Sequence, residues 1–122
     1  MTTGIVIFAH GSRIEPANAA VRAVAGELAR AGPFELVEAA FLELGRPNLE
    51  EAVTGLAEKG VGHVVVVPYF VTLGLHVERD LPRLVEDISL RYNSLRISVA
   101  PPLDGHPALV QILAERVRSV IG

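Results

Sequence analysis

Residues 64–80 read VVVVPYFVTLGLHVERD. The four consecutive valines are apolar on both faces of a strand, which is typical of an inner strand of a parallel sheet covered by helices. Pro68 lacks the N–H that a sheet needs, so this strand is predicted to end there. The loop from Tyr69 to Leu75 carries no charge, and His76 follows it directly. An apolar loop that ends in a histidine is typical of a pocket or an interface.

The rest of the chain repeats this alternation of a short apolar strand and an amphipathic helix. Strands are predicted at residues 4–9, 34–42, 62–67 and 95–100, and the helices after them are predicted to begin at Pro16, Pro47, Asp80 and Pro107. Asp80 is expected to cap its helix, with Pro82 in the first turn. The predicted apolar stripe of the first helix comprises Ala17, Ala20, Val21, Val24, Leu28 and Ala31, and that of the last comprises Leu109, Val110, Leu113, Val117, Val120 and Ile121.

Short loops between alternating strands and helices imply right-handed crossovers and a parallel sheet with helices on both faces. We therefore expect an α/β fold in which residues 1–122 form a single three-layer domain. The sheet is predicted to have four parallel strands in the flavodoxin-like order 2-1-3-4. This order has a topological switch between strands 1 and 3, and open α/β sheets bind ligands beyond the carboxyl ends of the strands at such a switch.

The composition argues against several classes of protein. Eleven basic and 14 acidic residues give a formal charge of −3, so no nucleic-acid partner is expected. The absence of cysteine excludes disulfides, thiolate metal sites and cysteine nucleophiles. The sequence shows neither a signal peptide nor an apolar run near the ~20 residues of a membrane span, which favours a cytoplasmic location without membrane contact. Half of the residues are hydrophobic, which hints at a surface covered by a partner.

In a parallel sheet, the residues that directly follow each strand lie at the same edge. Three of the four histidines are therefore expected at one edge, whereas His63 precedes a strand and is expected on the surface at the opposite edge. The candidate residues at the shared edge are His10, Ser12, Arg13, Glu43, Arg46, His76, Arg79, Asp80, Asp104 and His106.

Two imidazoles and a carboxylate, without thiolates, suit Co²⁺, Ni²⁺, Fe²⁺ or Zn²⁺ better than Mg²⁺ or Ca²⁺. His10, His76 and Glu43 therefore form a candidate metal site. Each also has a plainer interpretation: His10 could satisfy a turn carbonyl, His76 could lie on the surface at a helix start, and Glu43 could be solvated.

The arginines and the last histidine have two interpretations as well. Arg13, Arg46 and Arg79 either face an anionic ligand or are ordinary solvated charges. His106 either belongs to the site or simply begins the last helix before Pro107.

Other chemistries fit the sequence less well. His10 and Ser12 offer a serine near a histidine, but the chain has no G-x-S-x-G elbow of a hydrolase. No glycine-rich phosphate loop follows the first strand, so a nucleotide site lacks its usual signature. A phospho-acceptor receiver domain would need an acidic cluster where Phe8-Ala9-His10 stands.

Four segments in order resemble the small cobalt chelatases of the CbiX type, which are related to the sirohydrochlorin ferrochelatases. They are FAHGSR after the first strand, FLELGRPNLEEAV after the second, VVPYFVTLGLHVERDLP after the third and PPLDGHP before the last helix. The resemblance implies an enzyme that inserts a divalent metal, Co²⁺ or alternatively Ni²⁺ or Fe²⁺, into sirohydrochlorin, a tetrapyrrole with eight carboxylates. The metal is then the substrate, and no permanently bound cofactor is expected.

The same resemblance implies roles for individual residues. His10 and His76 match the family's metal-binding histidines, and Glu43 matches the acidic residue near them. Many relatives contain two such halves in one chain, so a single half implies a symmetric homodimer. In such a dimer the apolar loop residues Tyr69, Phe70, Val71 and Leu73 would line the cleft or the dimer seam. For an anionic tetrapyrrole substrate we expect the binding residues to be Ser12, Arg13, Arg46, Tyr69, Phe70 and Arg79. A carrier of tetrapyrrole or metal without catalysis, and a structural module, are the alternatives.

Overall fold

The fold was analysed in a computed structural model that describes residues 2–72 and 74–122, without the side chains of Leu75 and His76. Its sheet comprises β1 (Thr3–Ala9), β2 (Leu36–Phe41), β3 (His63–Pro68) and β4 (Arg96–Val99). All neighbouring strands pair in parallel, in the order β2-β1-β3-β4. The predicted strand order is therefore confirmed.

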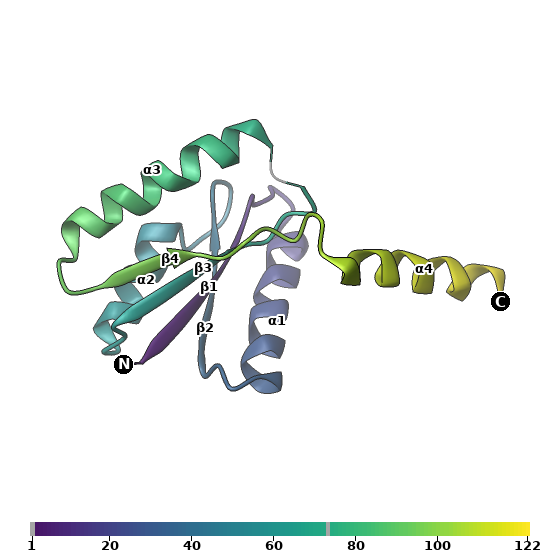
Figure 1. The fold of residues 1–122 in the computed structure, drawn as a ribbon, viewed down its shortest axis with the longest axis horizontal. Helices are drawn as coiled ribbons and strands as arrows, with labels where there is room; N and C mark the ends of the chain where they lie inside the picture. The colour runs from purple at the N-terminus through teal and green to yellow at the C-terminus, as the bar shows by residue number, and fades with distance from the viewer. Residues whose placement is uncertain (1, 73) are drawn as a thin grey trace.

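Four helices follow the strands: α1 (Glu15–Ala31), α2 (Leu49–Glu58), α3 (Leu75–Arg91) and α4 (Pro107–Ile121). Figure 1 shows α1 on one face of the sheet and α2 and α3 on the other. Strand residues alternate between these faces, because successive side chains of a strand point in opposite directions. In β1, Val6 and Phe8 pack in the core beneath α2 and α3, whereas Ile5 and Ile7 pack in the core beneath α1. The three-layer α/β architecture is thus confirmed.

The buried face of α1 differs from the predicted stripe. Its buried residues are Asn18 and Ala25, flanked by the partly buried Val21 and Leu28. Of the residues predicted for the stripe, Ala17, Ala20, Val24 and Ala31 are exposed. Alanine occurs all round this helix, so alanine positions gave no direction to the apolar face.

Two helix starts also differ from the predictions. Pro47 precedes α2, whose N-cap is Asn48: the Asn48 side chain accepts from the Glu51 N–H and the Glu51 side chain accepts from the Asn48 N–H. The sequence pattern N-x-x-E from Asn48 to Glu51 is the signature of this capping box. The helix α3 begins at Leu75 and contains Pro82 in its interior, so Asp80 is not its cap. A proline inside a helix is costly, but Val77 and Leu81 are buried and extend the apolar stripe upstream of it.

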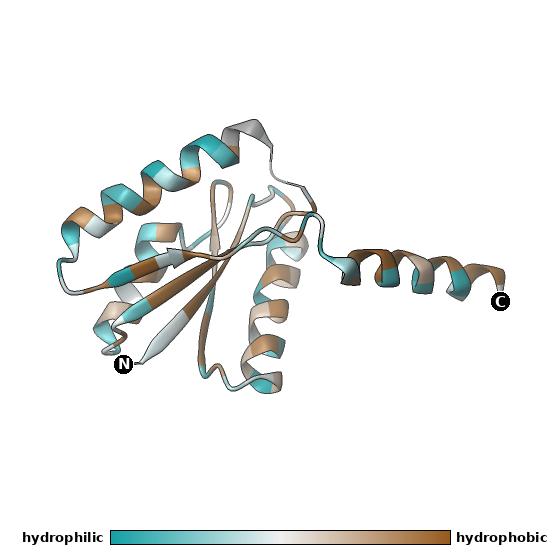
Figure 2. Ribbon diagram, in the orientation of Figure 1, coloured by the Kyte–Doolittle hydropathy of each residue, from teal (hydrophilic) through white to brown (hydrophobic). Residues whose placement is uncertain are grey.

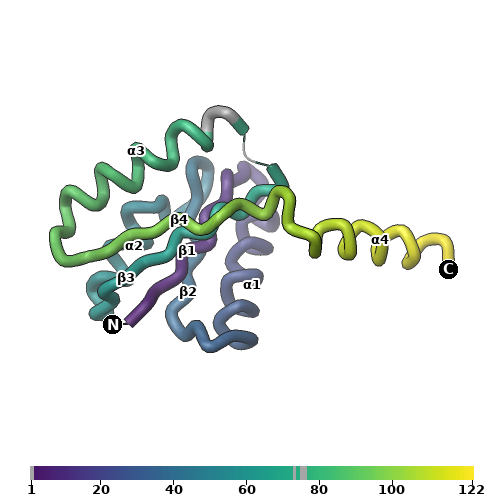
Figure 3. The backbone as a smooth tube through the Cα atoms, viewed as in Figure 1, coloured from purple at the N-terminus to yellow at the C-terminus, as the bar shows by residue number. Residues whose placement is uncertain are grey.

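The last helix departs from the layered arrangement. Figures 1 and 3 show α4 projecting away from the sheet beyond the end of β4. None of its described residues is buried, and in Figure 2 its ribbon carries hydrophobic residues along its whole length. No helix of the described residues is long and apolar enough to cross a membrane.

Candidate functional site

The carboxyl ends of β1 and β2 bring His10 and Glu43 together. The His10 Nε2 atom lies 3.5 Å from Glu43 Oε1, and each side chain is about half exposed. Backbone bonds continue the strand pairing into this edge, because Leu42 N donates to Ala9 O at 2.9 Å and Glu43 N donates to His10 O at 3.0 Å. The sheet therefore fixes the backbone of both residues while their side chains reach solvent.

The hydrogen bond of the His10 ring determines which nitrogen is available. Nδ1 lies 3.2 Å from the Gly11 carbonyl oxygen, which can only accept, so Nδ1 carries the proton of this bond. The neutral ring then has its lone pair on Nε2, the atom that faces Glu43. Two ligands bound at about 2.1 Å to one ion at a tetrahedral angle lie about 3.4 Å apart. The observed separation of 3.5 Å fits such an ion between His10 and Glu43.

Gly11 allows the two loops to approach. Its φ is +97°, and a Cβ placed on it would lie 1.7 Å from the carbonyl oxygen of Glu43. Only glycine fits there without moving the Glu43 backbone. The glycine of the HGS segment therefore sets the distance between the histidine and the glutamate.

Asn18 connects the same two loops and was missed in the sequence. This side chain is 2% exposed. Its Oδ1 accepts from Ser12 N at 2.9 Å, and its Nδ2 donates to Ser12 O at 2.9 Å and to Leu44 O at 3.0 Å. Leu44 has a φ of +57°, a conformation that is uncommon for leucine. A single asparagine on the buried face of α1 thus holds the loops that carry His10 and Glu43.

The predicted substrate residue Ser12 is used in this turn. Its hydroxyl oxygen accepts from the backbone N–H of Ile14 at 3.1 Å, and its backbone bonds to Asn18. Ser12 therefore lies beside His10 with a structural hydrogen bond already made.

The three candidate arginines lie in different settings. Arg46 is 82% exposed and donates to Glu51 Oε2 at 2.6 Å, a bond that raises the pKa of the guanidinium above its ordinary value. The Nε atom of Arg79 lies 3.6 Å from Asp80 Oδ1, and the Arg79 side chain is 63% exposed. Arg13 is exposed in the loop after β1. Arg46 thus reinforces the start of α2, and exposed pairs of this kind exchange partners at little cost.

The apolar loop after β3 divides into a packed and an exposed part. The ring of Phe70 contacts Phe8 edge to face, with centroids 6.3 Å apart, so Phe70 joins the core beneath α2 and α3. Tyr69 donates its N–H to Phe8 O at 2.7 Å and is 37% exposed, and Val71 is 72% exposed. Leu73 lies outside the described residues.

The three remaining histidines are His76, His106 and His63. His76 is the second residue of α3, and its side chain lies outside the described part of the structure. His106 is the N-cap of α4 and accepts from Ala108 N through Nδ1 at 3.0 Å, which agrees with its plainer interpretation. His63 lies at the opposite edge of the sheet, as predicted, but it is the first residue of β3 and partly buried rather than a surface residue, and its Nε2 lies 2.8 Å from Ser98 Oγ. Within residues 2–72 and 74–122, leaving aside the His76 side chain, no cluster of three metal-binding side chains is present.

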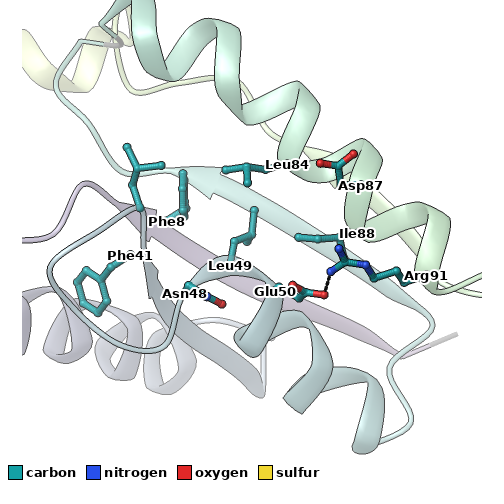
Figure 4. A pocket seen from close by; sticks show the side chains of 10 residues that line it. Phe8, Phe41, Asn48, Leu49, Glu50, Leu84, Asp87, Ile88 and Arg91 are labelled. Atoms are coloured by element: carbon teal, nitrogen blue, oxygen red, sulfur yellow. Dashed lines mark hydrogen bonds and ion pairs between the residues drawn. The ribbon is translucent and has the colours of Figure 1, made fainter.

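Several pockets lie along α3. An apolar cleft of about 390 Å³ runs along its first turns and the carboxyl ends of β3 and β4, lined by Pro68, Val77, Leu81, Val85, Val99 and Pro102. A smaller pocket of about 220 Å³ lies between α2 and α3. Figure 4 shows Leu49, Leu84 and Ile88 turned toward its interior, with the Arg91–Glu50 ion pair at one end. Among the described side chains, neither of these two pockets is lined by a predicted site residue, but the first is lined by Val77 and Glu78, which lie between His76 and Arg79 in the chain.

Comparisons with known proteins agree with one family. The family model CbiX matches residues 4–120. The chain is 31% identical to the sirohydrochlorin cobaltochelatase of Methanopyrus kandleri, over 97% of this chain and 96% of that one. It resembles the structure of a putative cobalamin biosynthesis CbiX protein from Marinobacter aquaeolei, with a TM-score of 0.87, 25% identity and coverage of 98% and 97%. It also resembles the sirohydrochlorin chelatase SirB from Bacillus subtilis in complex with cobalt, with a TM-score of 0.90 and 27% identity, over 98% of this chain and 51% of that one.

Proposed function

Since this chain belongs to the CbiX family, we propose that it is a chelatase that inserts a divalent metal, Co²⁺, into sirohydrochlorin for cobalamin synthesis. The observation that carries this proposal is the His10–Glu43 pair, in which Nε2 faces Oε1 across 3.5 Å at the carboxyl edge of the sheet. A ligand pair on an exposed edge can hold an ion while leaving other positions open to the macrocycle nitrogens. The metal is a substrate here, and we propose no permanently bound cofactor.

The proposed reaction exchanges two protons for one ion. Two pyrrolic N–H bonds of sirohydrochlorin break, the divalent metal binds the four ring nitrogens, and two protons leave. His10 and Glu43 hold the arriving ion, and His76, from the first turn of α3, is the proposed third ligand. An imidazole released by the metal is also a base that can accept a proton near neutral pH, and Glu43 is proposed as a further ligand or as a proton acceptor. Weak binding is required, because an ion held too tightly would not move to the macrocycle.

The remaining predicted residues are proposed to bind the macrocycle. Arg13, Arg46 and Arg79 would meet its carboxylates, for which Arg46 would have to leave Glu51. Tyr69 and the cleft along α3 offer apolar surface for the ring, and Phe70 supports that surface from the core. Ser12 is proposed to contribute through its position next to His10.

We also propose that residues 1–122 form one domain that acts as a cytoplasmic homodimer. The cleft along α3 has a volume of about 390 Å³, near the lower end of the ~300–1,000 Å³ of pockets for drug-sized ligands. Sirohydrochlorin with its eight carboxylates is larger than such ligands. A second copy facing the same edge would enclose the macrocycle.

The direct test mixes the protein with sirohydrochlorin and Co²⁺ without oxygen and follows the change in absorbance. His10→Ala, His76→Ala and Glu43→Gln are expected to slow insertion by at least about tenfold each, the effect of losing one positioned acid–base or ligand group. His63→Ala is the matched control, because this histidine lies at the opposite edge of the sheet. Insertion by His10→Ala and His76→Ala at the wild-type rate would contradict the assignment.

Two alternatives have distinct outcomes. Faster insertion of Ni²⁺ or Fe²⁺ than of Co²⁺ would place the chain in nickel-tetrapyrrole or sirohaem synthesis. Stoichiometric binding of metal or sirohydrochlorin, with insertion no faster than without protein, would identify a carrier.

A further inference from the structure

Arg22 connects three parts of the chain around the candidate site. It lies one turn beyond Asn18 on α1, so the two side chains share a face of the helix. Its Nη1 donates to Glu15 Oε1 at 2.5 Å, and its Nη2 donates to the carbonyl oxygen of Arg46 at 3.0 Å. Its guanidinium also lies over the ring of Phe41, with Cζ 5.3 Å from the ring centroid. One arginine thus joins the start of α1 to both ends of the loop after β2.

This loop comprises residues 42–46, and we call it the glutamate loop because it carries Glu43. The N–H of Phe41 donates to Pro47 O at 2.9 Å and closes the loop at its base. Gly45 packs on the Phe41 ring, where an added Cβ would lie 3.0 Å from Cγ. Since the loop rests on the same ring that the guanidinium covers, a shift of either one displaces the other.

Asn18 and Arg22 contact the glutamate loop in different environments. Asn18 is buried and donates to Leu44 O, so its loss leaves buried groups without partners. The Arg22 side chain is 40% exposed, so water can replace its donors at Arg46 O when they are lost. Ion pairs in such exposed settings add little to stability. A change at residue 22 is therefore expected to alter the position of the loop more than the stability of the fold.

The guanidinium suits a bridging role. It is planar and carries five N–H donors in fixed directions, so it can bond two partners and stack on a ring at the same time. In Arg22 these directions are used for Glu15 Oε1 and Arg46 O. This use distinguishes Arg22 from Arg13, Arg46 and Arg79, which are proposed to meet the carboxylates of the macrocycle.

We propose that Arg22 is a positioning residue for metal binding, which acts through the glutamate loop to keep Glu43 Oε1 opposite His10 Nε2. These two atoms lie 3.5 Å apart. A shift of about 1 Å would take the carboxylate out of reach of an ion bound at about 2.1 Å from the histidine. The inference rests on the proposed function, because it takes Glu43 as a metal ligand, and it adds a residue that places this ligand without binding the ion.

Titration with Co²⁺ in the absence of sirohydrochlorin tests the proposal. Arg22→Met keeps a long side chain over Phe41 but removes both hydrogen bonds. It is expected to raise the dissociation constant of Co²⁺ about tenfold, the lower end of the loss when a group that orients a metal ligand is removed. The visible absorbance of bound Co²⁺ measures this constant. Wild-type affinity in Arg22→Met would overturn the proposal.

The matched control is Arg30→Met. Arg30 also lies on α1, pairs with an acidic residue, Glu27, and is 69% exposed. This change removes the same charge from the same helix and is expected to leave the Co²⁺ affinity unchanged. An equal loss in Arg30→Met would mean that the charge of the helix, and not the bridge, determines the affinity, and would overturn the proposal.

A double-mutant cycle separates positioning from general damage. If Arg22 acts through Glu43, then Arg22→Met in a Glu43→Gln background should change the Co²⁺ affinity by less than about twofold, because no carboxylate remains to be placed. A tenfold loss in both backgrounds would overturn the proposal. In the insertion assay, the loss should appear in the KM for Co²⁺ and leave the KM for sirohydrochlorin within about twofold of wild type.

Arg22→Lys tests the bridge without removing the charge. Lysine keeps a cation beside Glu15, but its single ammonium lacks the planar fork that bonds both partners. We expect this variant to unfold in urea at the wild-type midpoint and to show most of the loss in Co²⁺ affinity. Wild-type affinity in Arg22→Lys would show that the charge suffices and would overturn the bridging role.

The same titrations distinguish a failure of this inference from a failure of the proposed function. Wild-type Co²⁺ affinity in Glu43→Gln would contradict Glu43 as a metal ligand and would refute both. A loss of affinity in Glu43→Gln, together with wild-type affinity in Arg22→Met, would refute the role of Arg22 and leave the proposed function intact.

Discussion

Gly11 shows how one residue sets the geometry of the candidate site. Replacing it with alanine would put a Cβ 1.7 Å from the Glu43 carbonyl oxygen at a φ of +97°. We expect Gly11→Ala to lower the free energy of unfolding by more than about 2 kcal/mol, from strain and displaced backbone together. Urea unfolding measures this, and the insertion assay should show a loss beyond that of stability, because the His10–Glu43 distance changes.

The control for Gly11→Ala is Gly55→Ala. Gly55 lies inside α2, and a Cβ there meets nothing within 4 Å. This change is expected to raise the free energy of unfolding by about 0.5–1 kcal/mol, since glycine is a poor helix former. Equal stability of the two variants would mean that the loop can shift to accept a side chain at residue 11.

Asn18 affects the site indirectly, because it holds the two loops that carry His10 and Glu43. Its amide satisfies Ser12 N, Ser12 O and Leu44 O in a buried position. Asn18→Ala leaves these groups without their partner and is expected to cost about 1–3 kcal/mol. Asn18→Asp keeps the acceptor for Ser12 N but turns an oxygen toward two carbonyls, so it should not rescue the loss. Thermal unfolding of both variants checks this, with the exposed Asn93→Ala as a neutral control; rescue by aspartate would show that the Nδ2 bonds contribute little.

At the scale of elements, the start of α2 is held by polar contacts. The Asn48 side chain accepts from Glu51 N at 2.8 Å, and Glu51 Oε1 accepts from Asn48 N at 2.9 Å. Loss of such a cap in Asn48→Ala is expected to cost about 1 kcal/mol in chemical unfolding. An unchanged unfolding midpoint would indicate that Pro47 and the packing of Leu49 suffice to start the helix.

The same cap gives a pH dependence with a defined sign. The backbone hydrogen bond from Asn48, and then the bond from Arg46, lower the pKa of the Glu51 carboxyl below its ordinary value of 4.5. A group whose pKa is depressed by folding adds stability above its unfolded pKa and loses it as the pH falls through the folded value. The stability difference between wild type and Glu51→Gln should therefore be larger at neutral pH than at about pH 3. A difference that is independent of pH would contradict the carboxylate's role.

At the scale of the whole molecule, the hydrophobic core is built from the sheet and the helices α1, α2 and α3, without α4. Neither core cluster includes a residue of α4. A chain that ends after Gly105 is therefore expected to fold, with cooperative thermal unfolding by circular dichroism, but to be monomeric and to insert Co²⁺ at least about tenfold more slowly if a partner completes the site. A truncated chain without cooperative unfolding would show that α4 is needed for the fold itself.

Much of the fold could be predicted because its signals are local. The contiguous valines of β3 and the apolar run of β1 mark buried strands, and their alternation with helices requires right-handed crossovers. The predicted start of α3 was wrong because Pro82 was interpreted as a first-turn residue. In the structure, the burial of Val77 and Leu81 outweighs the cost of a proline inside the helix. The predicted buried face of α1 was wrong because alanines occur on all sides of that helix and so do not mark one face.

The sequence by itself predicted the parallel sheet and its strand order, because the alternation of strands and helices and the handedness of their connections favour this topology. Only the tertiary structure decided that His10 Nε2 faces Glu43, that Gly11 and Asn18 fix this pair, and that no described residue of α4 is buried in its own chain. These features depend on contacts between residues far apart in the chain, or on where an apolar stripe finds its partner. An amphipathic pattern shows that a helix needs a partner, whereas the path of the backbone decides which surface can supply it.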